Sequence, residues 1–116
     1  MGRDYINAMS ELKIPDSVKN DISDVCAELH DNFKDNIYKL ILFGSYAKQN
    51  YQPDSDVDIA VVLNVLPPLK ERREYIPVFE FDVEIDLLFC SREQLSGNSM
   101  IYRWINEQGV VLYEQL

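Results

Sequence analysis

Apolar residues recur at helical spacing near the start of the chain. Steps of four, three, four and four positions place them on one side of a helix: Val18, Ile22, Val25, Leu29 and Phe33. Polar residues fill most of the positions between them. The pattern predicts an amphipathic helix over roughly 16–35, with Asp16 or Ser17 available to cap its N-terminus after Pro15. The preceding residues, 1–14, have room for a short helix.

Shorter apolar runs follow, and the pattern changes from helical to extended. The first run, 37–43, is too short for an independent helix and is rich in residues that favour strands. Strands are predicted over 37–43, 56–63, 83–90 and 110–113. Short helices are predicted around them, over 45–50, 69–75, 91–95 and 99–108. This mixture predicts an α+β fold, a small mixed sheet of about four or five strands flanked by helices.

A few residues are expected to begin or end these short helices. Ser45 and Ser91 stand where a side-chain cap is favoured, and Gly109 follows the last helix. In that last helix one side is predicted to carry Ile101, Trp104 and Ile105.

Length and charge narrow the possible functions. The chain has 116 residues, which predicts one domain over 1–116. Its 11 Lys and Arg against 20 Asp and Glu leave a net charge of −9, so direct binding to nucleic acid or to an anionic membrane surface is disfavoured. No apolar run reaches the roughly 18 residues of a membrane span, and the first residues lack an apolar signal core.

Cysteine and histidine contribute little candidate chemistry. Cys26 and Cys90 lie far apart without CxxC spacing, which favours packed thiols in a reduced, cytoplasmic protein over a disulfide. His30 is the only histidine, too little for a zinc site or a histidine-based triad, and it is expected on the exposed side of its helix.

Two aspartates interrupt the second predicted strand. Asp56 and Asp58 are two positions apart, so both side chains are expected on the same face of the strand. Two neighbouring carboxylates in an apolar strand repel each other and lose hydration, which is costly unless something compensates them. Oxygen ligands without a nearby His or Cys favour Mg²⁺ or Mn²⁺.

A further acid lies on the third predicted strand. If this strand pairs with the one that carries Asp56, then Asp86 can join the aspartate pair and complete a site for two metal ions. Glu84, two residues earlier, is the alternative third ligand. Such a pair of ions stabilises the attacking and leaving oxygens of a phosphoryl displacement.

A phosphate-binding turn is predicted just after the first strand. Gly44 allows the backbone to approach a phosphate closely, and Ser45 adds a hydroxyl and backbone N–H groups at the start of a helical turn. Lys48, one turn later, is expected near the phosphates. The residues together suggest a nucleoside triphosphate held at Gly44 and Ser45, with its metal ions on Asp56 and Asp58.

These motifs resemble the signature GS-x10-DxD of the DNA polymerase beta-like nucleotidyltransferase superfamily. Gly44-Ser45, ten intervening residues and Asp56-Val57-Asp58 match it, and the later Asp86 matches the third acid. The short chain resembles the minimal nucleotidyltransferase (MNT) family, commonly the antitoxins of HEPN/MNT toxin–antitoxin pairs. Where many members have glycine after the basic residue, this chain has Gln49.

The resemblance implies Mg²⁺-dependent transfer of AMP from ATP onto a hydroxyl, a tyrosine of a partner HEPN toxin. It assigns the triphosphate to Gly44 and Ser45 and the metals to Asp56, Asp58 and Asp86, with Asp86 also a candidate base. Two other functions stay open, transfer to a small-molecule acceptor and a toxin-binding antitoxin without catalysis. A calcium-binding EF-hand is excluded, because Ile59 and Val65 stand where that loop needs Gly and Glu.

Overall fold

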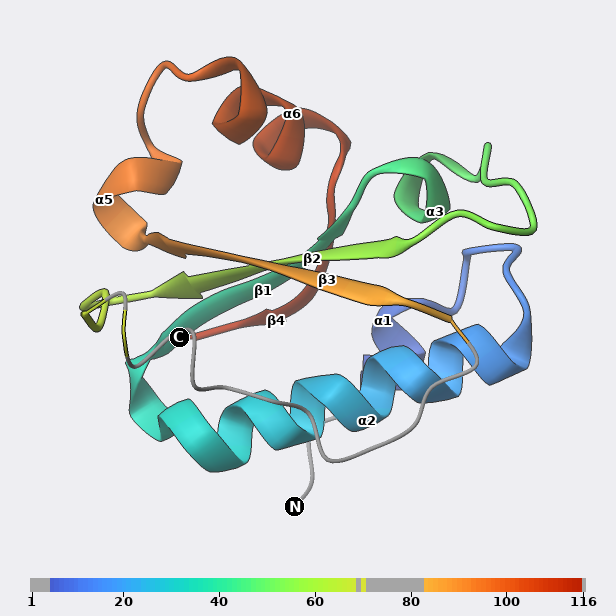
Figure 1. Ribbon diagram of the computed structural model, residues 1–116, viewed down its shortest axis with the longest axis horizontal. Coiled ribbons are helices and arrows are strands. Elements are labelled where there is room, and N and C mark those ends of the chain that lie inside the picture. Colours follow the sequence, from blue (N-terminus) through green and yellow to red (C-terminus); the bar gives the residue numbers. More distant parts are fainter. Residues whose placement is uncertain (1–4, 69, 71–82, 116) are drawn as a thin grey trace.

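A mixed sheet forms the centre of the molecule (Figure 1). The computed structural model describes residues 5–68, 70 and 83–115. Within them the sheet has the strand order β3-β2-β1-β4. The strands are β1 (Ile37–Phe43), β2 (Val57–Leu63), β3 (Ile85–Ser91) and β4 (Val110–Glu114). β1 pairs antiparallel with β2 and β4, whereas β2 and β3 are parallel. This confirms the predicted small mixed sheet.

Helices cover both faces of the sheet (Figure 1). On one face lies α2 (Asp16–Phe33), with α1 (Tyr5–Ala8) beside it and a 3-10 turn, η1 (Lys34–Asn36), leading into β1. On the other face lie α5 (Arg92–Leu95) and α6 (Met100–Gln108). The short α3 (Ser45–Lys48) follows β1 directly. Within the described residues, none of the helices is both long enough and apolar enough to cross a membrane.

The alternating side chains of the strands divide the buried residues into two cores. The larger core joins the predicted apolar side of α2 to one face of the sheet, with Leu40, Leu42 and Ile59 among its members. The smaller core lies under α5 and α6 and contains Ile41, Ala60 and Ile105. Burial of each large apolar side chain contributes about 1.5–3 kcal/mol, so the larger core is the main source of stability.

Most predicted elements agree with the structure to within one or two residues, and several local expectations are wrong. α2 has Pro15 as its N-cap without a side-chain cap hydrogen bond, so neither Asp16 nor Ser17 caps it. Gly44, not Ser45, is the N-cap of α3. The cap by Ser91 is confirmed, since its hydroxyl accepts from the Gln94 backbone N–H in a capping box. The helix predicted over 69–75 lies outside the described residues apart from Lys70.

Three side chains are placed differently from their sequence expectation. His30 is 5% exposed, so it is buried rather than on the free side of α2. Its ring packs edge-on against Tyr113 at a centroid distance of 4.3 Å, and its Nδ1 is hydrogen-bonded to the Tyr5 hydroxyl. On α6 only Ile105 of the predicted apolar side is buried, while Ile101 and Trp104 are 37% and 49% exposed. Cys26 and Cys90 are buried free thiols, as predicted.

Candidate active site

The acidic residues meet because β2 and β3 are parallel neighbours. Parallel strands bring their N-terminal ends to the same edge of a sheet, and the register places Asp58 directly opposite Asp86. Asp58 alternates with the buried Val57 and Ile59 of the larger core, so its side chain lies on the α5–α6 face of the sheet. The pairing of these two strands, on which the predicted site depended, is therefore present.

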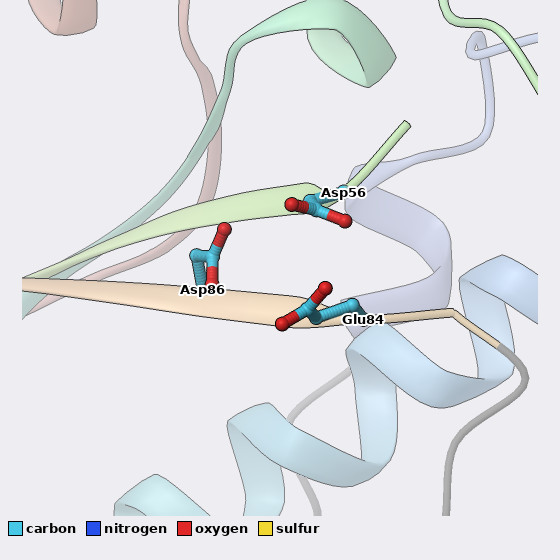
Figure 2. Close-up of side chains that lie close together, drawn as sticks. All are labelled: Asp56, Glu84 and Asp86. Atoms are coloured by element: carbon cyan, nitrogen blue, oxygen red, sulfur yellow. The ribbon is translucent and has the colours of Figure 1, made fainter. Parts of the chain in front are cut away.

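Three carboxylates form a close cluster at this edge. One carboxylate oxygen from each of Asp56, Glu84 and Asp86 lies within 4.8 Å of the others, and Figure 2 shows the three side chains converging from the ends of the two strands. Glu84, the alternative third ligand of the sequence prediction, thus joins Asp56 and Asp86. Asp58 lies next to this cluster but is half-buried and turned against Gly44.

The carboxyl groups of the site oppose each other's ionisation. Burial and the charge of Asp86 raise the pKa of Asp58, and burial together with the charge of Asp56 raises the pKa of Asp86. The charge of Asp56 is also the main cause of the raised pKa of Glu84. Among the described residues, no Lys or Arg forms an ion pair with these groups. Within the described part of the chain, their negative charge is therefore not offset by a basic side chain.

Gly44 is required by its conformation and by its neighbour. Its φ of 78° lies in the left-handed half of backbone space, which side chains with a Cβ rarely adopt. A Cβ at this position would also clash with the Asp58 carboxylate, lying 3.2 Å from its Cγ. The absence of a side chain lets the turn after β1 pack directly on the acidic residue, which brings Ser45 and the start of α3 to the same edge of the sheet.

Lys48 points toward α6 in this structure. Its Nζ lies over the Trp104 ring, 5.4 Å from the centroid, a cation–π contact between α3 and α6. The predicted contact of Lys48 with a phosphate stays a prediction. Trp104 had no predicted role, and no motif distinguishes it, because its position beside the site depends on how α6 packs over the sheet.

Gln49 adopts the left-handed conformation. It stands at the position where, by the resemblance, glycine is common. It is the C-cap of α3, with φ 61° and ψ 27°. Its side-chain Oε1 accepts a hydrogen bond of 2.7 Å from the Lys13 backbone N–H. The glutamine thus keeps the turn that a glycine would make, and in addition it ties α3 to the segment between α1 and α2.

Tyr46, like Trp104, was given no role by the sequence analysis. Its ring stacks on Tyr51 at a centroid distance of 4.5 Å and is 4% exposed. Burial, followed by Tyr51 and Asp56, raises the pKa of the Tyr46 hydroxyl, so the phenol stays protonated beside the acids. The pair forms an aromatic wall next to Asp56, made by one residue from α3 and one from the following loop.

Comparison with known proteins identifies the family of this chain. The chain belongs to the nucleotidyltransferase domain family, whose family model matches residues 21–107. Two proteins of Methanocaldococcus jannaschii, both named as candidate protein adenylyltransferases, are among its relatives. MJ0141 is 33% identical over 81 residues, 69% of this chain and 75% of the relative. MJ0604 is 41% identical over 93 residues, 73% of this chain and 87% of the relative.

A solved structure shares the fold. A crystal structure described as a toxin–antitoxin with AMP-PNP has a TM-score of 0.53 and 20% sequence identity to this chain. The match covers 80% of this chain and 73% of the other. The family and the curated relatives establish that the chain is a nucleotidyltransferase.

Proposed function

We propose that the chain transfers AMP from ATP to a tyrosine hydroxyl of a partner HEPN toxin and thereby acts as its antitoxin. The observation that carries the proposal is the grouping of Asp56, Glu84 and Asp86 beside the Gly44 turn. The names of the two M. jannaschii relatives, which describe transfer of AMP to protein, support this choice of acceptor. The fold is shared with a toxin–antitoxin structure that carries AMP-PNP, which supports ATP as the donor and a toxin as the partner.

The donor set of the acidic cluster fits a hard divalent cation. Its members offer carboxylate oxygens and no His or Cys, which suits Mg²⁺. The charge of Asp56 contributes to the raised pKa values of Glu84 and Asp86, as expected where negative charge is concentrated. Asp56, Asp86 and either Glu84 or Asp58 would hold the metal. Bound Mg²⁺ would polarise the phosphate oxygens and offset the charge that develops during transfer.

The chain's own residues account for the remaining parts of the reaction. Gly44 and Ser45 bind the triphosphate through the backbone N–H groups and the hydroxyl at the start of α3. The acceptor oxygen forms a bond to the α-phosphorus, and the bond from that phosphorus to pyrophosphate breaks. The Asp86 carboxylate accepts the proton that the acceptor hydroxyl loses, and pyrophosphate leaves.

We assign the acceptor to a second protein, because the candidate residues in the described part of the chain account for the nucleotide and the metal and not for an acceptor. Helices α5 and α6 are short, and their apolar residues are partly used to cover the sheet. The net charge of −9 argues against nucleic acid as the acceptor and suits a basic partner surface.

Intact-protein mass spectrometry tests the proposal directly. The protein is incubated with ATP, Mg²⁺ and the product of the neighbouring gene, tested as the partner toxin. We expect this partner to gain the mass of one or more AMP groups. Asp56→Asn and Asp86→Asn should lower the rate by about a thousandfold or more, because each removes a ligand of the metal that offsets transition-state charge. Asp24→Asn, an exposed carboxylate of α2, is the matched control and should leave the rate unchanged.

Other results of this experiment would point to the remaining functions. A toxin of unchanged mass that still forms a complex with the protein and with both aspartate variants would contradict transfer and indicate an antitoxin that acts by binding. Release of pyrophosphate with aminoglycosides, and none with the toxin, would replace the protein acceptor by a small molecule.

A further inference from the structure

A pocket lies at the opposite end of the sheet from the acidic cluster. It has a volume of about 630 Å³ and lies among the start of β1, the end of β2, α5 and α6. Its lining residue Arg92 directly follows β3. At about 3.3 Å per strand residue, the stretch of β3 from Asp86 to Ser91 spans about 17 Å. The pocket is therefore separate from the nucleotidyltransferase site.

Two cations and an aromatic ring line one part of this pocket. The Arg92 guanidinium lies over the Tyr38 ring, 4.2 Å from its centroid, and Lys39 Nζ lies 5.6 Å from the same centroid. Lys39 also pairs with Glu114 at 3.7 Å. Among the described residues, Arg92 forms no ion pair, although Glu93 is its neighbour in the chain. Its fork of N–H donors is held by the ring and remains available to an oxyanion.

Hydrogen-bond acceptors line another part of the pocket. The amide nitrogen of Asn106 donates to the Leu95 carbonyl at 2.9 Å, and that of Asn64 donates to Gln115 Oε1 at 3.0 Å. These bonds fix both amide groups. Within the described residues, no hydrogen bond reaches either amide oxygen, so both oxygens, together with the Glu93 carboxylate, can accept from N–H groups of a ligand.

We propose that this pocket binds a small phosphorylated molecule of mononucleotide size. Arg92 and Lys39 would receive the phosphate, Tyr38 and Leu95 supply contact surface, and the asparagine oxygens accept from amino or imino groups. The volume lies within the usual range for small-molecule sites, about 300–1,000 Å³, and exceeds what inorganic phosphate alone would fill. The proposal does not depend on the identity of the AMP acceptor.

Binding of AMP in the presence of EDTA tests this site apart from the other one. Without a metal ion the acidic cluster repels a phosphate, so AMP bound under these conditions has to be held elsewhere. We expect backbone amide NMR signals of Arg92, Ser96 and Asn106 to shift on addition of AMP, and the signal of Ser45 to stay in place. Inorganic phosphate, the second probe, should bind at least about tenfold more weakly because it lacks the organic part.

Variants of Arg92 complete the test. Arg92→Gln should weaken AMP binding by about tenfold or more, and Arg92→Lys should weaken it less, because it keeps the charge and loses the fork. Arg103→Gln removes a similar charge from the exposed surface of α6 and should have no effect. Arg92 is exposed and the Ser91–Gln94 capping box does not involve its side chain, so its variants should keep the parent melting temperature.

Three results would overturn the proposal. They are no shift at millimolar AMP in EDTA, shifts that survive Arg92→Gln, and phosphate binding as tight as AMP binding. None of them bears on AMP transfer to the toxin, which depends on the acidic cluster.

Discussion

At the scale of single residues, the close approach of Gly44 to Asp58 joins the proposed phosphate-binding turn to the acidic residues. We expect Gly44→Ala to lower the free energy of unfolding by about 1–3 kcal/mol, because alanine is strained at positive φ and its Cβ clashes with the Asp58 carboxylate. Nucleotidyl transfer should also fall, since relief of the clash displaces Asp58 or the turn. Chemical denaturation and the mass-spectrometric assay measure the two effects.

Gly97→Ala is the control for this substitution. Gly97 lies outside the left-handed region, and a Cβ there would meet only the Gln94 carbonyl oxygen, at 3.1 Å. A Gly44→Ala variant as stable and as active as Gly97→Ala would show that the close approach to Asp58 is dispensable.

The acidic cluster should cost the metal-free protein stability. The pKa of Asp86 is raised in the folded state, so the folded protein binds this proton more tightly than the unfolded chain does, and stability falls as pH rises through the raised value. Asp86→Asn should therefore raise the melting temperature at pH 7 in EDTA. The gain should disappear as the pH falls below about 4, where aspartate is protonated in both states.

Magnesium should reverse that order of stability. At a Mg²⁺ concentration about 100-fold above its Kd, the parent protein should gain about 2.7 kcal/mol, whereas Asp86→Asn should gain far less. Thermal melts with and without Mg²⁺, with Asp24→Asn as the control, test this. An equal response of all three proteins would argue against a metal on Asp86.

At the scale of elements, α1 is fastened to α2 through the buried Tyr5–His30 hydrogen bond. Tyr5→Phe should lower the free energy of unfolding by about 1–3 kcal/mol, because a buried ring nitrogen loses its partner. Tyr102→Phe, which removes a hydroxyl from a partly buried tyrosine on α6, is the matched control and should cost less. Equal losses in the two variants, measured by denaturation, would contradict a specific role for this bond.

The same helix pair shows what sequence periodicity can and cannot predict. The spacing from Val18 to Phe33 identified α2 and its buried side, because helical geometry fixes which positions share a face. His30 adjoins that side, next to Leu29, but the pattern does not say whether the edge of the apolar side is covered. His30 is covered by Tyr5 of α1 and Tyr113 of β4, which are distant in sequence and come together only in the folded protein.

For the site, the sequence spacing identified the acidic residues better than it predicted which of them would lie together. The i, i+2 spacing predicted Asp56 and Asp58 on one face of a strand, but β2 begins at Val57, so only Asp58 lies within it. The apolar run around Asp86 identified its strand. The sequence predicted Asp56, Asp58 and Asp86 as the metal ligands, with Glu84 as the alternative to Asp86. In the structure the close cluster contains both Glu84 and Asp86 and leaves out Asp58. That depends on the parallel register of β2 and β3 and on the contact that holds Asp58 against Gly44.

At the scale of the whole molecule, the two cores each enclose one cysteine. Burial raises the pKa of both thiols, that of Cys90 to about 11, so at pH 8 they are protonated and out of reach of solvent. A thiol reagent such as Ellman's reagent should label neither residue in the native protein and both in guanidinium chloride. The absorbance of the released thiolate reports the count, and rapid labelling of a single cysteine would reveal that one core opens independently.

The parallel pairing of β2 and β3 also has a consequence for the order of folding. These neighbours are separated by residues 64–84 of the chain, whereas β1 and β2 are joined by a shorter connection through α3, so β3 closes the longer loop when it joins the sheet. That same step brings Glu84 and Asp86 against Asp56 and Asp58. The repulsion among these proposed metal ligands should therefore oppose completion of the sheet, and we expect a cation that screens it to speed folding.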